Sequence, residues 1–192
     1  MKEYIEYIKM IVVLSTISAV CGFGLAAISA FTKERIEEQK LLNVEGPTVK
    51  KILAGSTNDL IKDRKEIVIN KQKYIVFIGK KNGAPWALAY TTDGTGFGGE
   101  MSVMIGFDLI NDTLAGVGIT SHKETPGVGS RVTEDSFTKT FKDKGLNAVF
   151  KIKADGGVID AVTGATVSSR GVCGAVQKGV PLYQDIKKQV LK

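Results

Sequence analysis

The chain is poor in the residue types that most often carry catalysis or hold metals. It contains one histidine, His122, and two cysteines, Cys21 and Cys173, which have no Cys or His partner at metal-ligand spacing. Paired carboxylates, a nucleophilic triad and a Walker phosphate-binding sequence are also missing. These absences argue against a stand-alone catalyst. We expect the two cysteines to be small apolar side chains that form no disulfide with each other.

A concentrated basic surface is missing as well. The net charge is +6, but the lysines are spread along the chain and interleaved with acids. No basic block with interleaved aromatic residues is present, so the sequence predicts no nucleic-acid partner. Its 192 residues suffice for one domain with a core and an appendage.

Charge is absent altogether from residues 10–32, which form one long apolar run. A helix of about 20 such residues crosses a bilayer. The run is longer than the apolar part of a signal peptide, and the residues before it are not net positive. We therefore predict a retained single-span anchor, in which Gly22 and Gly24 allow another membrane helix to approach closely.

The charges beside this span leave its orientation open. Lys2 and Lys9 precede it, whereas Lys33, Arg35 and Lys40 follow it, a count that leans weakly toward a cytoplasmic C-terminal domain. Long domains cross membranes largely regardless of such charges, so the count does not decide the orientation.

The remaining residues predict an α+β fold, in which one mixed domain has a sheet rich in antiparallel strands. The expected organisation is a tail and membrane helix (1–32), a helical stalk and linker (33–58) and the domain itself (59–192). Asn82-Gly83 is a strong hairpin signal. Alternating or continuous apolar runs predict strands at 66–69, 74–78, 84–92, 101–108, 114–121, 147–153 and 158–162. Periodicity and capping predict a helical turn at 48–53, a helix at 134–144 capped by Thr133, and a C-terminal helix after Thr166 interrupted at 179–181.

The glycine-dense stretch 93–99 superficially matches a dinucleotide-binding fingerprint. We reject that interpretation because a strand, not a helix, follows it. A tight bend, or a close approach of Gly98 and Gly99 to a ligand, explains the glycines better. Trp86, on the preceding strand, could stack on a planar ligand, but core or rim packing is the interpretation we favour.

The stretch from Asp160 to Val172 carries the strongest chemical signal. A short apolar strand passes through the turn Thr163-Gly164 into a helix that starts near Thr166. The N–H groups of a first helical turn lack partners and favour an anion such as a phosphate. An ordinary helix N-cap with no further role explains the same pattern. Candidate ligand-binding residues here are Thr163, Gly164, Ala165, Val167, Ser168 and Ser169.

A second candidate is the loop His122-Lys-Glu-Thr-Pro-Gly-Val-Gly129. A lone histidine before a loop is usually structural, and composition gives it no other role. Pro126-Gly127 fixes a turn that lets the main chain lie close to a planar ligand.

Together the two stretches resemble the FMN-binding domain family. Asp160-x-x-Thr-Gly-Ala-Thr166 resembles its flavinylation signature, and His122-x-Glu-Thr-Pro-Gly-Val-Gly129 its second hallmark. The resemblance implies that a flavin transferase esterifies Thr166 to the phosphate of FMN, and that Asp160 is the leading acid of the motif. It further implies that His122, Glu124, Thr125, Pro126 and Gly127 lie beside the flavin.

With the N-terminal span, the chain resembles the G subunits of Rnf-type ferredoxin:NAD oxidoreductases. This implies an electron relay that works with other membrane subunits, with its FMN domain on the extracytoplasmic side of the inner membrane. The C subunits of sodium-translocating NADH:quinone oxidoreductases share both motifs and are an alternative, although they are typically longer. A membrane-anchored scaffold without a cofactor and a self-sufficient flavin reductase also remain open.

Overall fold

The computed structural model describes the backbone of residues 2–191 and the side chains of residues 4–191. Met1 and Lys192, the outer ends of the predicted tail and domain, lie outside the described residues. The chain divides into two compact units, Met1–Leu41 and Leu42–Lys192.

The first unit is a single helix, α1 (Lys2–Lys40). Its large apolar side chains are exposed, as expected of a helix whose surroundings are lipid. The hydroxyls of Thr16 and Thr32 donate to the carbonyls four residues earlier, so these polar groups are satisfied inside the apolar run. The helix is long and apolar enough to cross a membrane, as predicted for residues 10–32.

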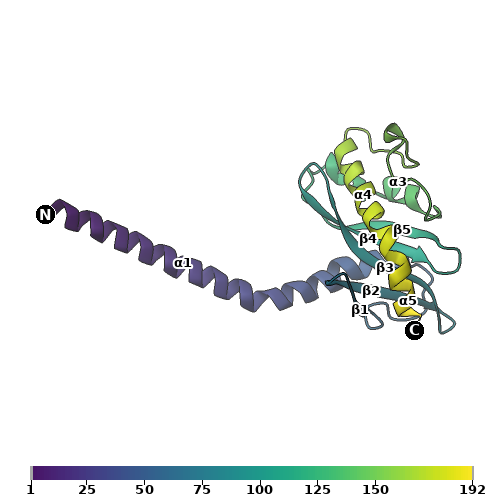
Figure 1. The fold of residues 1–192 in the computed structure, drawn as a ribbon, viewed down its shortest axis with the longest axis horizontal. Helices are drawn as coiled ribbons and strands as arrows, with labels where there is room; N and C mark the ends of the chain where they lie inside the picture. Colours follow the sequence, from purple (N-terminus) through teal and green to yellow (C-terminus); the bar gives the residue numbers. More distant parts are fainter. Residues whose placement is uncertain (1, 192) are drawn as a thin grey trace. The chain divides into compact units, whose positions relative to one another are not determined.

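The second unit is built on an antiparallel sheet whose five described strands lie in chain order (Figure 1). Two of its turns carry consecutive residues with positive φ, Asn70-Lys71 and Asn82-Gly83, as type I′ hairpins require. The predicted hairpin at Asn82-Gly83 and five of the seven predicted strands are therefore confirmed. The strands are β1 (Lys65–Ile69), β2 (Gln72–Lys81), β3 (Ala84–Thr95), β4 (Glu100–Asp108) and β5 (Thr113–Ser121).

Two C-terminal helices cover one face of the sheet: α4 (Thr166–Gly179) and α5 (Tyr183–Val190), joined by the 3₁₀ turn η5 (Val180–Leu182) (Figure 1). This confirms the predicted helix and its interruption. The backbones of β3 and α4 come so close that a Cβ on Gly94 would collide with the carbonyl oxygen of Gly171. The Tyr90 hydroxyl also donates to the carbonyl of Gly179 at 2.9 Å. These contacts fix α4 on the sheet.

The short helix α2 (Gly46–Ile52) packs on β4 and β5, over a stripe of small residues. A Cβ on Gly106 or Gly118 would collide with the side chains of Ile52 and Thr48 respectively. Pro47 occupies the first turn of α2, where its missing N–H costs nothing. The predicted helical turn at 48–53 is confirmed, and the five-residue π-helical segment η1 (Leu41–Glu45) precedes it.

Three predicted elements are wrong. The helix at 134–144 is only α3 (Asp135–Thr138) followed by the 3₁₀ turn η3 (Lys139–Phe141), and Thr133 does not cap it but donates to the Ser130 carbonyl. Residues 147–153 and 158–162 are not strands and share only the bridge Ile152–Ile159. Phe150, Ile152 and Ile159 are buried by packing and not in a strand ladder, whereas Val149 and Val158 remain exposed. The two remaining 3₁₀ turns are η2 (Gly129–Thr133) and η4 (Lys153–Asp155).

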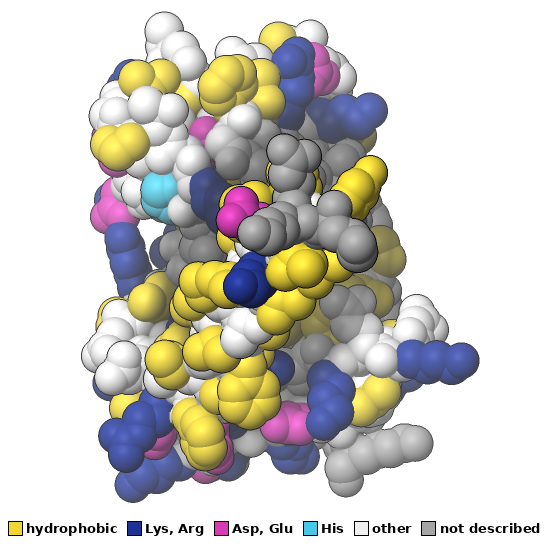
Figure 2. Space-filling model, turned by 90° about the vertical axis from the view of Figure 1, so that its left-hand side faces the viewer, with side chains coloured by type: hydrophobic (Ala, Val, Ile, Leu, Met, Phe, Trp, Pro, Cys, Tyr) yellow, Lys and Arg dark blue, Asp and Glu magenta, His cyan; other side chains and the backbone are white. Residues whose placement is uncertain are grey.

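Lysine and arginine side chains are dispersed among acidic and uncharged ones on the face shown in Figure 2. This distribution agrees with the interleaved charges of the sequence.

Candidate functional site

The motif Thr163–Thr166 forms a tight turn that leads directly into α4. The N–H of Ala165 donates to the carbonyl of Val162 at 2.9 Å, and Gly164 has a φ of +81°, as the third position of a type II turn requires. Thr166 is the first residue of α4, and the N-cap Ala165 offers no side-chain acceptor. The exposed hydroxyl of Thr166 therefore lies beside N–H groups that no cap satisfies.

The two serines that follow are engaged inside the protein. Ser169 is buried, accepts a hydrogen bond from the N–H of Val162 and donates to the carbonyl of Ala165, so it fastens both ends of the turn. Ser168 donates to a carboxylate oxygen of Glu124 at 2.6 Å. Both hydroxyls stabilise the shape of the site, and both are already hydrogen-bonded to groups of the protein.

Glu124 joins three segments that are far apart in the sequence. Glu124 is only 6% exposed, and its carboxylate accepts the Ser168 hydroxyl from α4 and the Gly98 N–H from the β3–β4 turn at 3.1 Å. A Cβ on Gly96 or Gly129 would collide with this carboxylate. Gly96 and Gly129 thus make room for Glu124. Packing against Glu124, and not contact with a ligand, explains why residue 96 of the glycine-dense stretch is a glycine.

The loop 122–129 has the turn that Pro126-Gly127 predicts. The N–H of Val128 donates to the Thr125 carbonyl, and Gly127 has a φ of +74°. His122 is half-buried, and its Nδ1 accepts the N–H of Glu124 at 3.2 Å. The histidine has a structural contact inside the loop.

The motif turn, the loop and the β3–β4 turn surround a cavity of about 400 Å³, a volume typical of small-ligand sites. The predicted residues that line it are Glu124, Thr125, Gly164, Ala165, Thr166, Val167 and Ser168. The predicted residues outside its lining are Gly98, Gly99, His122, Pro126, Gly127, Asp160, Thr163 and Ser169.

The sequence predictions missed two apolar residues of the cavity wall, Phe97 and Val128, whereas Val167 was among the predicted residues. Phe97 and Val128 are 77% and 51% exposed, and Val167 beside Thr166 is 45% exposed. Phe97 lies in the stretch 93–99, which was singled out for its glycines. Val128 lies in the loop 122–129, which was singled out for its Pro126-Gly127 turn. Together the three side chains offer apolar contact area to a planar ring, next to a hydroxyl and free N–H groups.

The charged residues around the motif are paired. Asp160 is exposed and its carboxylate lies 2.7 Å from the ammonium of Lys153. Arg170 holds Asp155 through two hydrogen bonds of 2.7 and 2.8 Å, and this contact lowers the pKa of the Asp155 carboxyl. Burial raises the pKa of the Cys173 thiol, one turn further along α4, to about 12, which makes it an inert apolar side chain.

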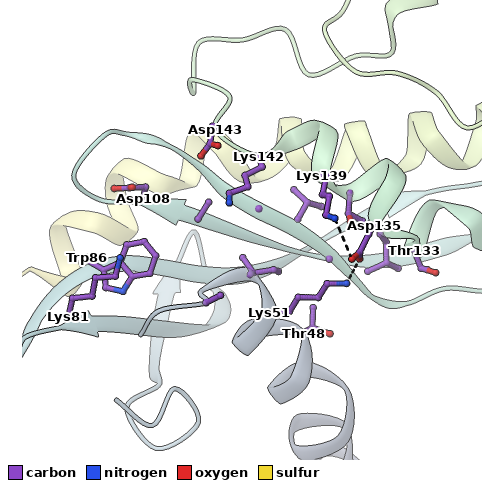
Figure 3. Close-up of a pocket in the computed structure, with 18 residues that line it drawn as sticks. Thr48, Lys51, Lys81, Trp86, Asp108, Thr133, Asp135, Lys139, Lys142 and Asp143 are labelled. Carbon is purple, nitrogen blue, oxygen red and sulfur yellow. Dashed lines mark hydrogen bonds and ion pairs between the residues drawn. The ribbon is translucent and has the colours of Figure 1, made fainter. Parts of the chain in front are cut away.

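A larger cavity of about 490 Å³ lies against the outer face of β5. Figure 3 shows Asp135 at one end of it, bonded to Lys51 of α2 and to Lys139. At the other end the Lys81 ammonium stacks 3.8 Å from the ring centroid of Trp86. Trp86 therefore packs at this cavity and does not line the one beside Thr166, in agreement with the packing interpretation.

Comparisons with known proteins agree with this geometry. Residues 96–180 match the FMN-binding domain family, a range that contains both loops and all of α4. Two solved structures share the fold: the C subunit of the Na⁺-translocating NADH-quinone reductase of Parabacteroides distasonis (23% identity, 68% of each chain, TM-score 0.53) and NqrC of Shewanella oneidensis (26% identity, 61% of this chain and 60% of that one, TM-score 0.50). The cavity beside Thr166 thus belongs to an FMN-binding domain.

The curated relatives are components of larger assemblies. The chain is 31% identical to the G subunit of the Na⁺-translocating ferredoxin:NAD⁺ oxidoreductase complex of Acetobacterium woodii, over 94% of this chain and 93% of the relative. It is 30% identical to the G subunit of the ion-translocating oxidoreductase complex of Escherichia coli O157:H7 (86% and 85%). The match to the Cereibacter sphaeroides G subunit, also 30% identical, spans 60% of this chain and only 55% of that relative. The chain belongs to the family of G subunits of ion-translocating oxidoreductase complexes.

Proposed function

We propose that this protein is the electron-carrying G subunit of a membrane-bound ferredoxin:NAD oxidoreductase of the Rnf type. In this role it relays electrons through an FMN joined to Thr166. The observation that carries the proposal is the position of Thr166, whose exposed hydroxyl stands at the uncapped start of α4 and on the wall of the cavity. The full-length likeness to the Acetobacterium woodii protein favours this role over that of a C subunit of a quinone reductase.

The residues present fit FMN. Free N–H groups at the N-terminus of α4 suit its phosphate, and Phe97, Val128 and Val167 suit the faces of its ring. The N–H of Thr125, on the loop that lines the cavity, suits an acceptor on the ring edge, whereas its carbonyl already accepts the N–H groups of Val128 and Ser130. When bound, FMN supplies the one- and two-electron redox chemistry, while the protein supplies position and electrostatics.

The attachment requires a second protein, a flavin transferase. The Thr166 oxygen would form a bond to the phosphorus of an activated flavin nucleotide such as FAD. The pyrophosphate bond would break, AMP would leave, and a base of the transferase would take the hydroxyl proton. Ser168 and Ser169 do not compete as nucleophiles because both are buried and hydrogen-bonded.

The anchor and partners complete the proposal. α1 would hold the domain at the inner membrane, on its extracytoplasmic side, beside other membrane subunits of the complex. A covalent bond would keep the carrier in place there, because a dissociated flavin would be lost. Fusions of alkaline phosphatase and of a fluorescent reporter that matures in the cytoplasm, each placed at the C-terminus, test the orientation. We expect phosphatase activity without reporter fluorescence.

The attachment site is tested by co-expressing the full chain with the transferase and measuring its intact mass. The wild type should gain the mass of FMN less one water and show in-gel flavin fluorescence after denaturation. Thr166→Val should remain bare, whereas Thr163→Ser, which keeps the neighbouring hydroxyl, should be modified like the wild type. Fluorescence retained by Thr166→Val would contradict the assignment, and a wild type without flavin absorption bands would favour a scaffold.

A further inference from the structure

The phosphate proposed at Thr166 carries a charge for which the site has no obvious partner. This inference rests on the proposed function. A phosphate esterified on two sides keeps one negative charge at neutral pH. The start of α4 offers it N–H dipoles, but the N-cap Ala165 contributes no side-chain donor. A cationic partner for this phosphate would therefore come from elsewhere in the domain.

Two of the cations near the motif are already occupied. The Lys153 ammonium lies 2.7 Å from a carboxylate oxygen of Asp160. Arg170 is bound to both carboxylate oxygens of Asp155 in a bidentate pair. Bidentate pairs of this kind hold a guanidinium in one orientation, so Arg170 is not available to the phosphate.

Arg131, a third cation near the motif, has hydrogen-bond donors to spare. A guanidinium has five N–H donors, and Arg131 uses one of them in a 3.3 Å hydrogen bond to the carbonyl of Thr163. Its other contact is a 3.8 Å ion pair with Glu134, in which both side chains are about half exposed. Exposed pairs at such a distance contribute little. Most of the donors of Arg131 thus remain available to a ligand.

The position of Arg131 matches this role. It lies in η2, two residues beyond Gly129, which lines the same cavity as Thr166. Its contact with Thr163 places the guanidinium on the turn whose end bears the hydroxyl to be modified. We propose that Arg131 pairs with the phosphodiester at Thr166, neutralises its charge and holds the linkage against the N-terminus of α4.

A purely structural role for Arg131 makes a different prediction. If its function is only to satisfy the Thr163 carbonyl, substitution would lower the stability of the unmodified and the flavinylated protein equally. A phosphate partner would add a loss that only the flavinylated protein shows, together with a changed environment of the phosphorus. The measurement must therefore report on the phosphorus itself.

The test uses the full chain in detergent, carrying FMN, as wild type, Arg131→Gln, Arg131→Lys and the control Arg170→Gln. The ³¹P NMR shift of the phosphodiester and the rate at which a phosphodiesterase releases flavin nucleotide are both measured. We expect Arg131→Gln to move the resonance and to speed release about tenfold, the factor that a charge-assisted hydrogen bond of modest strength supplies. Arg131→Lys should restore part of the effect, because lysine keeps the charge but not the forked geometry.

The control removes the same charge from a neighbouring position whose guanidinium is bound to Asp155, so Arg170→Gln should match the wild type. An unchanged resonance and release rate in Arg131→Gln, or equal changes in both variants, overturns the inference while leaving the flavin at Thr166. A wild-type intact mass equal to that of the bare polypeptide overturns the proposed function and this inference together.

Discussion

Ser168 and Glu124 are joined by a 2.6 Å hydrogen bond between residues 44 positions apart in the sequence. Both side chains are buried, and the same carboxylate also holds the β3–β4 turn through Gly98. The bond connects the first turn of α4 to the loop that follows β5. The position of Thr166 in the cavity therefore depends on the Ser168–Glu124 hydrogen bond, which forms within the protein and needs no ligand.

Breaking this contact should destabilise the domain. In Ser168→Ala one carboxylate oxygen of Glu124 loses its donor inside the protein, which we expect to cost about 1.5–3 kcal/mol of unfolding free energy. Glu124→Gln should cost a similar amount, since the new amide nitrogen cannot accept. A double-mutant cycle in thermal or urea unfolding should give a coupling energy of about 0.5–3 kcal/mol. Additive effects would show that the two side chains do not act as a pair.

The close approach of β3 and α4 predicts a strong effect of a single methyl group. Gly94→Ala would drive a Cβ into the carbonyl oxygen of Gly171, and backbone shifts of this kind cost about 1–3 kcal/mol. Gly174→Ala is the control. Gly174 lies in α4, like Gly171, but a Cβ there meets nothing within 4 Å. We expect the control to be neutral or stabilising by up to about 1 kcal/mol, through helix propensity. Equal melting temperatures for the two variants would contradict the packing described here.

The motif turn depends on the left-handed conformation of Gly164, whose φ is +81°. A Cβ would meet no neighbour there, so Gly164→Ala isolates the conformational penalty of about 1–2 kcal/mol. Gly145→Ala, also free of neighbours and with no positive φ, is the control. We expect Gly164→Ala to lower both the melting temperature and the fraction of chains that carry flavin. Normal flavinylation of this variant would show that the turn can re-form without glycine.

Acid should destabilise the domain in a defined window. The pKa values of Asp63, Asp112, Asp135 and Asp155 lie below the ordinary value of 3.8, chiefly because each accepts a hydrogen bond from a cationic side chain: Lys80, Lys187, Lys51 and Arg170 respectively. Between the folded and unfolded pKa values the unfolded chain binds more protons, so stability falls as pH decreases.

We therefore expect the melting temperature to be nearly independent of these groups near neutrality and to start falling near pH 4. Below that pH the stabilisation that the four carboxylates contribute is progressively lost. Thermal melts at a series of pH values, with salt held constant, measure this profile. Arg170→Gln should flatten the acid limb, because the pKa of Asp155 would return toward its ordinary value. A profile that is equally steep in this variant would assign the acid limb to other carboxylates.

Local signals predicted the sheet and its helices well, because hairpin turns and apolar periodicity act over short distances. They failed at 134–144 and 147–162, where side chains pack into the core without regular backbone pairing. The cavity beside Thr166 has some features that local sequence signals predict and others that they do not. Thr166 and the Pro126-Gly127 turn are visible in local motifs, whereas the Glu124–Ser168 bond and the contact of Arg131 with Thr163 arise only from tertiary packing.

The arrangement of the strands in chain order implies that the sheet can form before α4 folds onto it. Each strand pairs with its neighbours in sequence, so the platform can assemble from contacts that are short in contour length, which favours rapid folding. A chain synthesised from its N-terminus completes β5 before the residues of α4 exist. α4, which begins at the proposed attachment site, is thus among the last elements to be synthesised, and the proposed transferase would act on it after the sheet has formed.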